Sequence, residues 1–276
     1  MSPAPIGARA FLFTLFGDYC QPLTPHGAWI GGLINLAALF SITPVALRSA
    51  VSRMAAEGWL VADRRPPRPK YRLTNRGNSL IEEGVRRIYG QQGNGWDGRW
   101  LLVAYSMPES RRNQRDRLRS GLSFHGFGSL GNGLYVSPRD LRQEVLKLVQ
   151  THGVGRQVTV HFGEVEWPER PGHIVKRAWD LTVLEKRYAA YESTNRAALA
   201  EVRALQKAGK LDSREAFWRR FALTHQHRHM LFGDPDLPAE LLPKLWIGHA
   251  AKGIFREYNL LLKSQAERYY LEVVGA

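Results

Sequence analysis

Apolar residues near the start of the chain recur at helical spacing. The stretch from residue 8 to residue 16 is mostly apolar and predicts a helix. A second helix is indicated by apolar residues at the i, i+3, i+4 and i+7 positions, namely Ile30, Leu33, Ile34 and Ala37. The chain is therefore expected to open with two helices, each with one side suited to burial.

A third helix is predicted after a short turn. Thr43 is a residue type that caps helix N-termini, and Pro44 suits the first helical position because its φ is already helical. Gly58 suits the position just past the C-terminus. The stripe expected to be buried consists of Leu47, Ala50, Val51 and Met54.

Two short strand-like runs follow, at residues 59–61 and 71–73, and they flank a basic, proline-rich segment. Thr74 is expected to cap a fourth helix, with four residues directed inward: Leu80, Ile81, Val85 and Ile88. The order helix, helix, turn, helix, basic hairpin, helix is typical of a winged helix-turn-helix. This DNA-binding domain is predicted over residues 1–92, before a polar, glycine-bearing linker.

Strand and helix patterns alternate over residues 96–178. Strands are predicted at residues 100–105, near 123–130, at 134–136 and at 157–162, with helices at 111–122 and 141–149. This β-α-β-β-α-β order is typical of a ferredoxin-like domain. Residues 179–276 are predicted to be almost wholly helical. The expected fold class is α+β and multidomain, ending in an all-α C-terminal domain.

The charge of the chain indicates a kind of partner only where basic residues are concentrated. The formal net charge is +14, from 39 basic and 25 acidic residues, and residues 1–95 hold 11 of the former and 5 of the latter. A basic domain attracts polyanions by counterion release. Cys20 is the only cysteine, so an intramolecular disulfide and a multi-cysteine zinc site are excluded. No stretch is apolar enough to span a membrane, so we expect a soluble, cytoplasmic protein.

The polar side of the third helix suits the major groove of duplex DNA. Opposite the apolar stripe stand side chains that can contact base edges and phosphates: Arg48, Ser49, Ser52 and Arg53. The predicted hairpin adds a second set of cations: Arg64, Arg65, Arg68, Lys70 and Arg72. An ordinary solvated helix face would explain the first set alone. The two sets together favour DNA binding.

At these residues the chain resembles a known family, the PaaX-like repressors of bacterial phenylacetate-degradation operons. The resemblance rests on short motifs along nearly the whole chain, at residues 29–34, 45–54, 57–60, 96–100, 115–119, 126–128, 234–238 and 241–243. It implies a winged-helix domain, a central domain similar to the CRISPR-associated Cas2 fold, and a helical C-terminal domain. It also implies a homodimer that binds operator DNA, represses catabolic genes, and is released by an aryl-acetyl-CoA thioester, typically phenylacetyl-CoA.

An acyl-CoA effector would need cations for its phosphates and aromatic residues for its acyl group. The candidate cations outside the DNA-binding domain are Arg111, Arg112, Arg115, Arg219, Arg220 and Arg228. For any one of them, a packed helix with a solvated basic side is the simpler interpretation.

The resemblance to Cas2 raises the alternative of a metal-dependent nuclease. Nucleases of that fold place an acidic residue at the end of the first strand, where this chain has Ser106, and Glu109 comes only after the strand. We therefore expect no enzymatic activity, no catalytic residue, no bound metal and no cofactor. His225, His227 and His229 are interpreted as a polar or ligand-facing patch, because no carboxylate completes a metal site.

The residues are also compatible with two other kinds of regulator. The same scaffold could serve a regulator with a different effector, or one that activates transcription. The operator sequence, the acyl group of the effector and the dimer interface do not follow from the residues.

Overall fold

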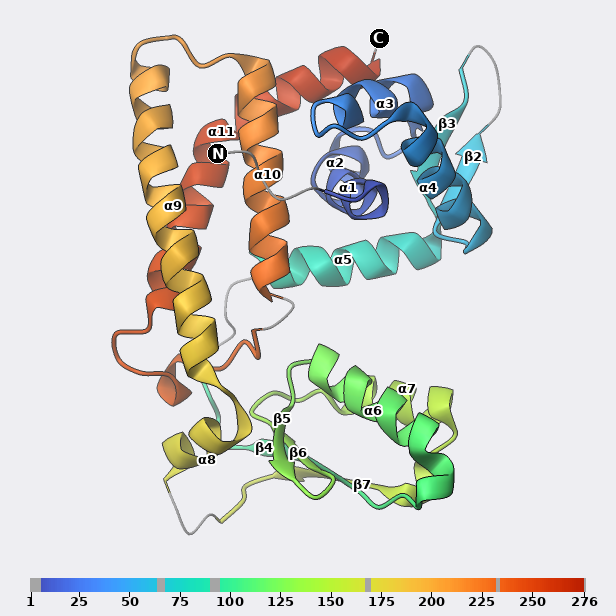
Figure 1. Cartoon of the computed structure of the whole chain (residues 1–276), viewed down its shortest axis with the longest axis vertical. Coiled ribbons are helices and arrows are strands. Elements are labelled where there is room, and N and C mark those ends of the chain that lie inside the picture. Colours follow the sequence, from blue (N-terminus) through green and yellow to red (C-terminus); the bar gives the residue numbers. More distant parts are fainter. Residues whose placement is uncertain (1–5, 64–67, 90–94, 167–169, 232–233, 276) are drawn as a thin grey trace. The chain divides into compact units, whose positions relative to one another are not determined.

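A computed structural model describes residues 6–63, 68–89, 95–166, 170–231 and 234–275 (Figure 1). The chain divides into two compact units. The first comprises Met1–Gly90, Tyr191–Arg228 and Ala251–Ala276, and the second comprises Gln91–Ala190 and His229–Ala250. Three long helices, α9 (Leu181–Lys207), α10 (Ser213–Leu231) and α11 (Ile247–Gly275), run across the division. The three domains predicted from the sequence, 1–92, 96–178 and 179–276, stay a prediction.

The first unit begins with short elements and adds parts of the long helices. Its elements in chain order are α1 (Ala8–Leu15), a π-helical turn η1 (Phe16–Cys20), α2 (Gln21–Leu23), β1 (Ala28–Trp29), α3 (Ile30–Ala38), α4 (Pro44–Ala56), β2 (Leu60–Asp63), β3 (Lys70–Leu73) and α5 (Asn75–Tyr89). The four predicted helices and the hairpin occur in the predicted order, but α2 and β1, between the first two of those helices, were not predicted. The first predicted helix is shorter than expected, because residue 16 already belongs to η1.

Local sequence accounts for the boundaries of α4. The backbone N–H of Ala46 donates to the Thr43 hydroxyl at 3.2 Å, and Pro44 occupies the first helical position. Gly58, just past the end, has φ +75°, a conformation that glycine adopts without steric cost. The predicted stripe of Leu47, Ala50, Val51 and Met54 is buried. It packs α4 against α1 and α3.

The three strands of this unit form one antiparallel sheet in the order β1-β3-β2. In the hairpin, Leu60 pairs with Leu73 and Asp63 pairs with Lys70. Thr74 caps α5 as predicted, since its hydroxyl accepts from the Gly77 backbone N–H at 3.1 Å. One detail was wrong: Leu80 is 41% exposed, because Gly77 and Ile81 supply the inward side of that helix.

Helices from the end of the chain complete the core of the first unit. The Phe11 and Phe221 rings lie 4.8 Å apart between centroids, and Tyr19 lies 4.9 Å from Phe217. At Gly32, an added Cβ would meet the Val274 Cα at 2.9 Å, so only glycine permits this approach of α3 to α11. Burial of this core therefore depends on residues far apart in sequence.

The second unit contains a four-stranded antiparallel sheet. Its elements are β4 (Trp100–Tyr105), η2 (Glu109–Arg111), α6 (Arg112–Phe124), β5 (Gly128–Gly131), β6 (Leu134–Ser137), α7 (Arg142–His152), η3 (Gly155–Gln157), β7 (Val158–Gly163), α8 (Pro171–Ala178) and η4 (Ala239–Leu241). The sheet order is β5-β6-β4-β7. The predicted order of strands and helices is confirmed.

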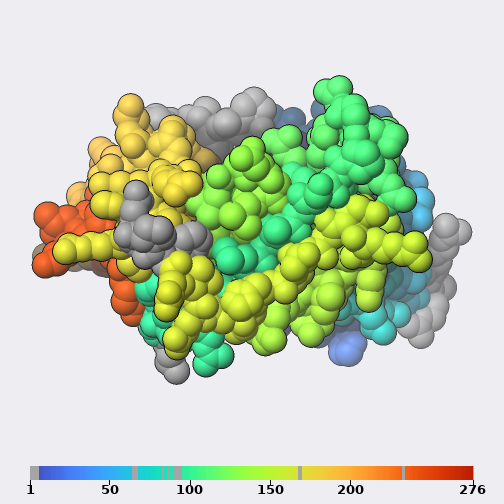
Figure 2. All heavy atoms as spheres, turned by 90° about the horizontal axis from the view of Figure 1, so that it is seen from below, coloured from blue at the N-terminus to red at the C-terminus, as the bar shows by residue number. Residues whose placement is uncertain are grey.

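Alternation along β4 places side chains on both sides of this sheet. Leu101 and Val103 join the core formed with α6 and α7 (Figure 1). Trp100 lies in the other core, with α8 and Leu237. Strand β7 forms one edge of the sheet, and Figure 2 shows its yellow-green residues on the surface.

The strand expected near residues 123–130 lies later than its predicted start. Residues 123 and 124 still belong to α6, and the strand covers Gly128–Gly131. Gly126 and Gly131 have φ values of +83° and +91°, which explains the glycine-rich turn around them. Among the described helices, none is long and apolar enough to cross a membrane.

Candidate nucleic-acid interface

Helix α4 presents a continuous polar surface on the side opposite its buried stripe. All four residues predicted to contact DNA from this helix are exposed: Arg48, Ser49, Ser52 and Arg53. The structure therefore brings them together on one helix surface. Serine hydroxyls and guanidinium groups at such spacing can reach both base edges and phosphates.

The two arginines of this surface are available for a ligand. Within the described residues, no hydrogen bond or ion pair engages the Arg48 or Arg53 side chain. The nearest carboxylate in sequence, Glu57, is held elsewhere: Arg9 donates to its two oxygens at 2.7 and 2.6 Å. This contact lowers the pKa of the Glu57 carboxyl, chiefly through the hydrogen bond from Arg9. The charges on α4 are thus not neutralised from within that helix.

Sequence reasoning missed one residue of this surface. Val45 is 76% exposed in the first turn of α4, one helical turn before Ser49. An apolar side chain gains nothing from exposure to water. A thymine methyl group in the major groove would give it an apolar partner. The signal was present in the sequence, since position 45 lies outside the apolar stripe that begins at Leu47.

The hairpin beside α4 carries a second basic set, of which the structure describes part. Arg64 and Arg65 lie outside the described residues. Lys70 is exposed, and the Arg68 guanidinium carbon lies 4.5 Å from the centre of the Trp29 ring. Such stacking engages the flat face of a guanidinium and not its N–H edge. Arg68 is therefore fixed in place without losing its ability to bind a phosphate.

Arg72 lies on the returning strand of the hairpin, β3, as the sequence suggested. It is exposed, but it lines a hollow with Gln21, Thr24 and Asn78, at the base of the hairpin. Lys70 and Arg72 alternate with Tyr71 and share one side of β3. Of these two cations, Lys70 lies nearer the tip.

The predicted effector cations of the second unit are engaged in local contacts. Arg111 donates to the Gln157 side-chain oxygen at 3.2 Å, and Arg115 donates to Glu109 at 3.0 Å. Arg112 lies 3.7 Å from Glu109. The exposed ion pairs of Arg112 and Arg115 with Glu109 contribute little to stability, so a bound anion could replace Glu109.

In the first unit, the predicted effector cations differ in their surroundings. Arg219 is paired with Glu201 at 2.8 Å and with Glu215 at 2.7 Å. Arg228 donates to the Ala10 carbonyl at 3.1 Å, and burial lowers the pKa of its guanidinium. Arg220 is 4% exposed and lines a cavity near Asp18. Of these three, Arg220 is the residue that lines this cavity.

The three histidines interpreted as a polar or ligand-facing patch lie on α10 in different surroundings. His225 and His227 are buried, and the Nδ1 of His225 lies 3.3 Å from the Thr14 hydroxyl. The His227 ring stacks on Phe255 with centroids 3.9 Å apart, and burial lowers the pKa of His227 to about 3. The three histidines therefore do not form one patch, because His225 and His227 are buried and His229 is exposed.

Cys20 and Ser106 both occupy structural rather than reactive positions. Burial raises the pKa of the Cys20 thiol to about 12, so the nucleophilic thiolate is suppressed. Ser106 follows β4, and its backbone N–H donates to the Gln157 carbonyl at 3.1 Å. In the described parts of the chain, no three histidine, cysteine or acidic residues cluster in a way that could hold a metal ion.

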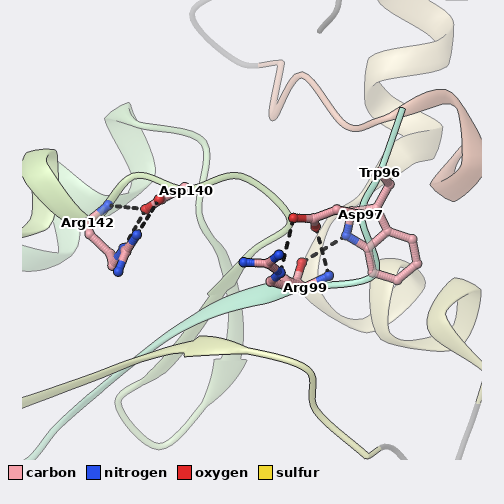
Figure 3. Close-up of polar contacts among 5 residues, drawn as sticks. All are labelled: Trp96, Asp97, Arg99, Asp140 and Arg142. Atoms are coloured by element: carbon pink, nitrogen blue, oxygen red, sulfur yellow. Dashed lines mark hydrogen bonds and ion pairs between the residues drawn. The ribbon is translucent and has the colours of Figure 1, made fainter. Parts of the chain in front are cut away.

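One motif shared with the resembling family has a structural role in the second unit. The Trp96 indole N–H donates to the Arg99 carbonyl at 2.8 Å, and Asp97 accepts from the Arg99 backbone N–H at 2.9 Å (Figure 3). Farther along, Arg142 donates twice to Asp140, at 2.8 and 2.7 Å. These contacts close the turns before β4 and α7.

A second such motif surrounds Asp234. Its carboxylate accepts hydrogen bonds from the Tyr188 hydroxyl and from the Asp236 backbone N–H. The contact ties the loop after α10 to the first part of α9. The residues of both motifs make contacts that stabilise the fold. The candidate interface is therefore formed by the surface of α4 and the hairpin.

Comparisons with known proteins agree with this arrangement. Three family models match: PaaX-like protein at residues 7–77, the PaaX protein central Cas2-like domain at residues 93–175, and the PaaX-like protein C-terminal domain at residues 179–272. The chain is 28% identical over 257 residues to the transcriptional repressor PaaX of Escherichia coli (strain K12), covering 91% of this chain and 79% of that protein. It is also similar to the solved structure of the uncharacterized protein Rv0674 from Mycobacterium tuberculosis, with a TM-score of 0.58 and 22% identity, covering 95% and 98% of the two chains.

Proposed function

Because the chain belongs to the PaaX-like family, we propose that it is a sequence-specific DNA-binding repressor of an aromatic-acid catabolic operon, of the phenylacetate type. The observation that carries this proposal is the exposed surface of α4, where the Arg48 and Arg53 side chains make no hydrogen bond or ion pair among the described residues. The similarity to the Escherichia coli repressor supports regulation of transcription and gives no reason to expect an enzyme.

The N-terminal elements act as a winged helix-turn-helix. In this arrangement α3 and α4 form the helix-turn-helix, α4 enters the major groove, and its N-terminal residues contact base edges. Val45, Arg48, Ser49 and Ser52 are then the residues nearest the bases. Arginine reads guanine by donating to its O6 and N7 atoms, so Arg48 is the side chain best suited to direct readout.

The hairpin of β2 and β3 acts as the wing. Arg68 and Lys70 contact phosphates, which positions α4 in the groove without contributing sequence information. Arg64, Arg65 and Arg72 complete the proposed set. The stacking of Arg68 on Trp29 supports this role, because an ordered cation loses less conformational entropy on binding than a free one.

The second unit has the strand and helix order of a ferredoxin-like domain, here of the Cas2-like kind. Its role is not chemical in this proposal, since Ser106 stands at the end of β4 where a nuclease would need a carboxylate. The protein acts in the cytoplasm, where its DNA target is. A homodimer matches the two half-sites of an operator, which repeat at about 34–36 Å.

An aryl-acetyl-CoA thioester, such as phenylacetyl-CoA, acts as the effector that releases the repressor. A ligand shifts a DNA-binding equilibrium only by its different affinities for the two states. The thioester offers several phosphate charges as well as a ring, so it can engage cations that a free acid would not reach.

Titration of the full-length protein against its promoter fragment tests the proposal. We expect specific binding that weakens as salt rises, and release by phenylacetyl-CoA but not by phenylacetate. Failure to prefer the promoter fragment over random duplex DNA would contradict the repressor function. Release by a different acyl-CoA would keep the mechanism and change the pathway.

A further inference from the structure

A cavity of about 450 Å³ lies within the first unit, apart from the surface of α4. Its wall is formed by residues of η1, α5, α10 and α11. This volume lies in the range of small-molecule sites in proteins. Gln21 and Pro22 of α2 complete the wall. The residues that matter to the chemistry of the cavity are Asp18, Val85, Tyr89, Arg220, Phe255, Arg256, Asn259, Leu260, Lys263 and Glu267.

Arg220 is a buried cation with unused hydrogen-bonding capacity. Its side chain stacks over the Tyr19 ring at 4.9 Å, and its Nε donates to the Asn259 side-chain oxygen at 3.3 Å. Its Nη1 atom is buried and has no hydrogen-bond partner in the described structure. No ion pair joins Arg220 to a carboxylate among the described residues either. A buried guanidinium is stabilised by hydrogen bonds to acceptors, so the N–H groups on Nη1 are left for a ligand to satisfy.

Asp18 is the acidic group that acts on Arg220 from nearby, and no hydrogen bond or ion pair joins the two side chains among the described contacts. Its carboxylate already accepts a hydrogen bond from the Tyr89 hydroxyl at 3.0 Å. Burial raises the pKa of the Asp18 carboxyl, which disfavours its charged form. The Asp18–Tyr89 contact therefore forms one side of the cavity, and it leaves the Nη1 atom of Arg220 without a hydrogen-bond partner among the described residues.

Two further cations border the same cavity from α11. Arg256 and Lys263 are both exposed, and Lys263 lies 3.9 Å from Glu267. The lining thus holds three cations and two carboxylates, Asp18 and Glu267, so the balance of charge around the cavity favours an anion. Val85, Phe255 and Leu260 supply an apolar wall beside them.

We propose that this cavity binds an organic anion, with its carboxylate or phosphate on Arg220 and its apolar part against Val85, Phe255 and Leu260. Arg256 and Lys263 hold further negative charge at the opening. A free aromatic carboxylate and an aromatic coenzyme A thioester both combine negative charge with an apolar part. Among the six candidate cations from the sequence, the geometry selects Arg220 as the anion-binding one.

The cavity is connected to the DNA-binding elements through α5; this regulatory part rests on the proposed function. Tyr89 is the last residue of α5, while Thr74 caps the other end of that helix. The Thr74 hydroxyl also donates to the Gly58 carbonyl at 2.7 Å, just after α4. A ligand that displaces the Tyr89 hydroxyl from Asp18 would move a helix that is tied to both α4 and the hairpin.

Isothermal titration calorimetry on the full-length protein without DNA tests the site. The three probes are phenylacetyl-CoA, coenzyme A and phenylacetate. We expect at least one to bind, and we expect Arg220→Gln to weaken it about tenfold or more, the usual effect of losing a charge-assisted hydrogen bond. Arg219→Gln, a change at the adjacent residue outside the cavity, is the matched control and should bind as the wild type does.

A second variant keeps the test decisive if Arg220→Gln does not fold. The exposed pair Arg256→Gln/Lys263→Gln should fold and bind the same probe several-fold more weakly, whereas Arg268→Gln on the same helix should not. Binding by thioester alone, or by the free acid alone, supports the site and identifies the source of the anion. The proposal is overturned if no probe binds, or if folded cavity variants bind normally. Promoter binding is measured separately, so its failure counts against the repressor function and not against the cavity.

Discussion

The guanidinium of Arg68 lies over the ring of Trp29, with 4.5 Å between the guanidinium carbon and the ring centroid. This contact joins the returning side of the hairpin to β1. Two backbone contacts reinforce it: Trp29 is paired with Lys70, and the Ile30 N–H donates to the Pro69 carbonyl at 3.3 Å. The proposed wing is therefore anchored on its β3 side to the strand that precedes α3.

Trp29→Ala should weaken DNA binding without changing sequence preference. Removing an exposed cation–π contact frees Arg68, and the loss of about 0.5–1 kcal/mol corresponds to about two- to fivefold in affinity. Fluorescence anisotropy with promoter and random duplexes measures both affinities. Trp29→Phe retains an aromatic ring and should lie closer to the wild type. A selective loss for the promoter alone would contradict the phosphate-positioning role.

The elements that carry the proposed DNA-binding surface could be predicted well from local signals in the sequence. Thr43, Pro44 and Gly58 mark the ends of α4 by residue type, and the spacing of its apolar positions fixes which side is exposed. Such features depend on neighbours within a few residues. That is why the exposed surface with Arg48 and Arg53 was identified correctly.

Long-range packing could not be predicted in the same way. Phe217, Phe221 and Tyr270 belong to the same core as Phe11 and Tyr19, and no local pattern joins positions some two hundred residues apart. For the same reason, the burial of His227 could not be predicted from the sequence. It also left Arg220 indistinguishable from Arg219 in the sequence, although one borders a cavity and the other is paired with carboxylates.

Thr43→Ala should destabilise the protein. The substitution removes the acceptor for the Ala46 N–H at the start of α4, and losing such a cap costs about 0.5–2 kcal/mol. Chemical denaturation followed by circular dichroism measures the change. Ser79→Ala on α5 is the control, because the Ser79 hydroxyl donates only to the Asn75 carbonyl within an exposed helix. Equal stability of Thr43→Ala and wild type would exclude a role for the cap.

Buried His227 should make stability fall in acid. Its folded pKa of about 3 lies below the ordinary value of 6.5, because burial and the nearby charges of Lys252 and Arg256 disfavour the imidazolium. Between those two pH values the unfolded chain binds a proton that the folded chain does not. Stability is therefore lost as pH falls below 6.5, by about 1.4 kcal/mol per pH unit for one such group.

His227→Phe isolates this contribution. Phenylalanine keeps the ring against Phe255 but cannot take up a proton. The Tm difference between variant and wild type should grow in favour of the variant as pH falls from 7 to 4.5. A difference that stays constant across this range would show that His227 does not titrate between the two states.

The second unit should not cleave nucleic acid. Ser106 cannot bind a divalent ion as a carboxylate does, and metal catalysis of phosphodiester hydrolysis depends on such ligands. Incubation with Mg²⁺ or Mn²⁺ and labelled duplex DNA, single-stranded DNA or RNA should leave each substrate intact. Cleavage that disappears in Glu109→Gln, the acidic residue just after β4, would contradict this.

Affinity for the promoter fragment of Arg48→Ala and Arg53→Ala tests the central claim most directly. If these side chains contact bases, each change should cost about 1–3 kcal/mol on the specific site and much less on random duplex DNA. Lys207→Ala, an exposed cation on α9, is the control and should bind as the wild type does. The account predicts a loss of at least fivefold for Arg48→Ala that is confined to the promoter. Unchanged promoter affinity in both folded arginine variants would contradict the assignment of α4 as the helix that reads DNA.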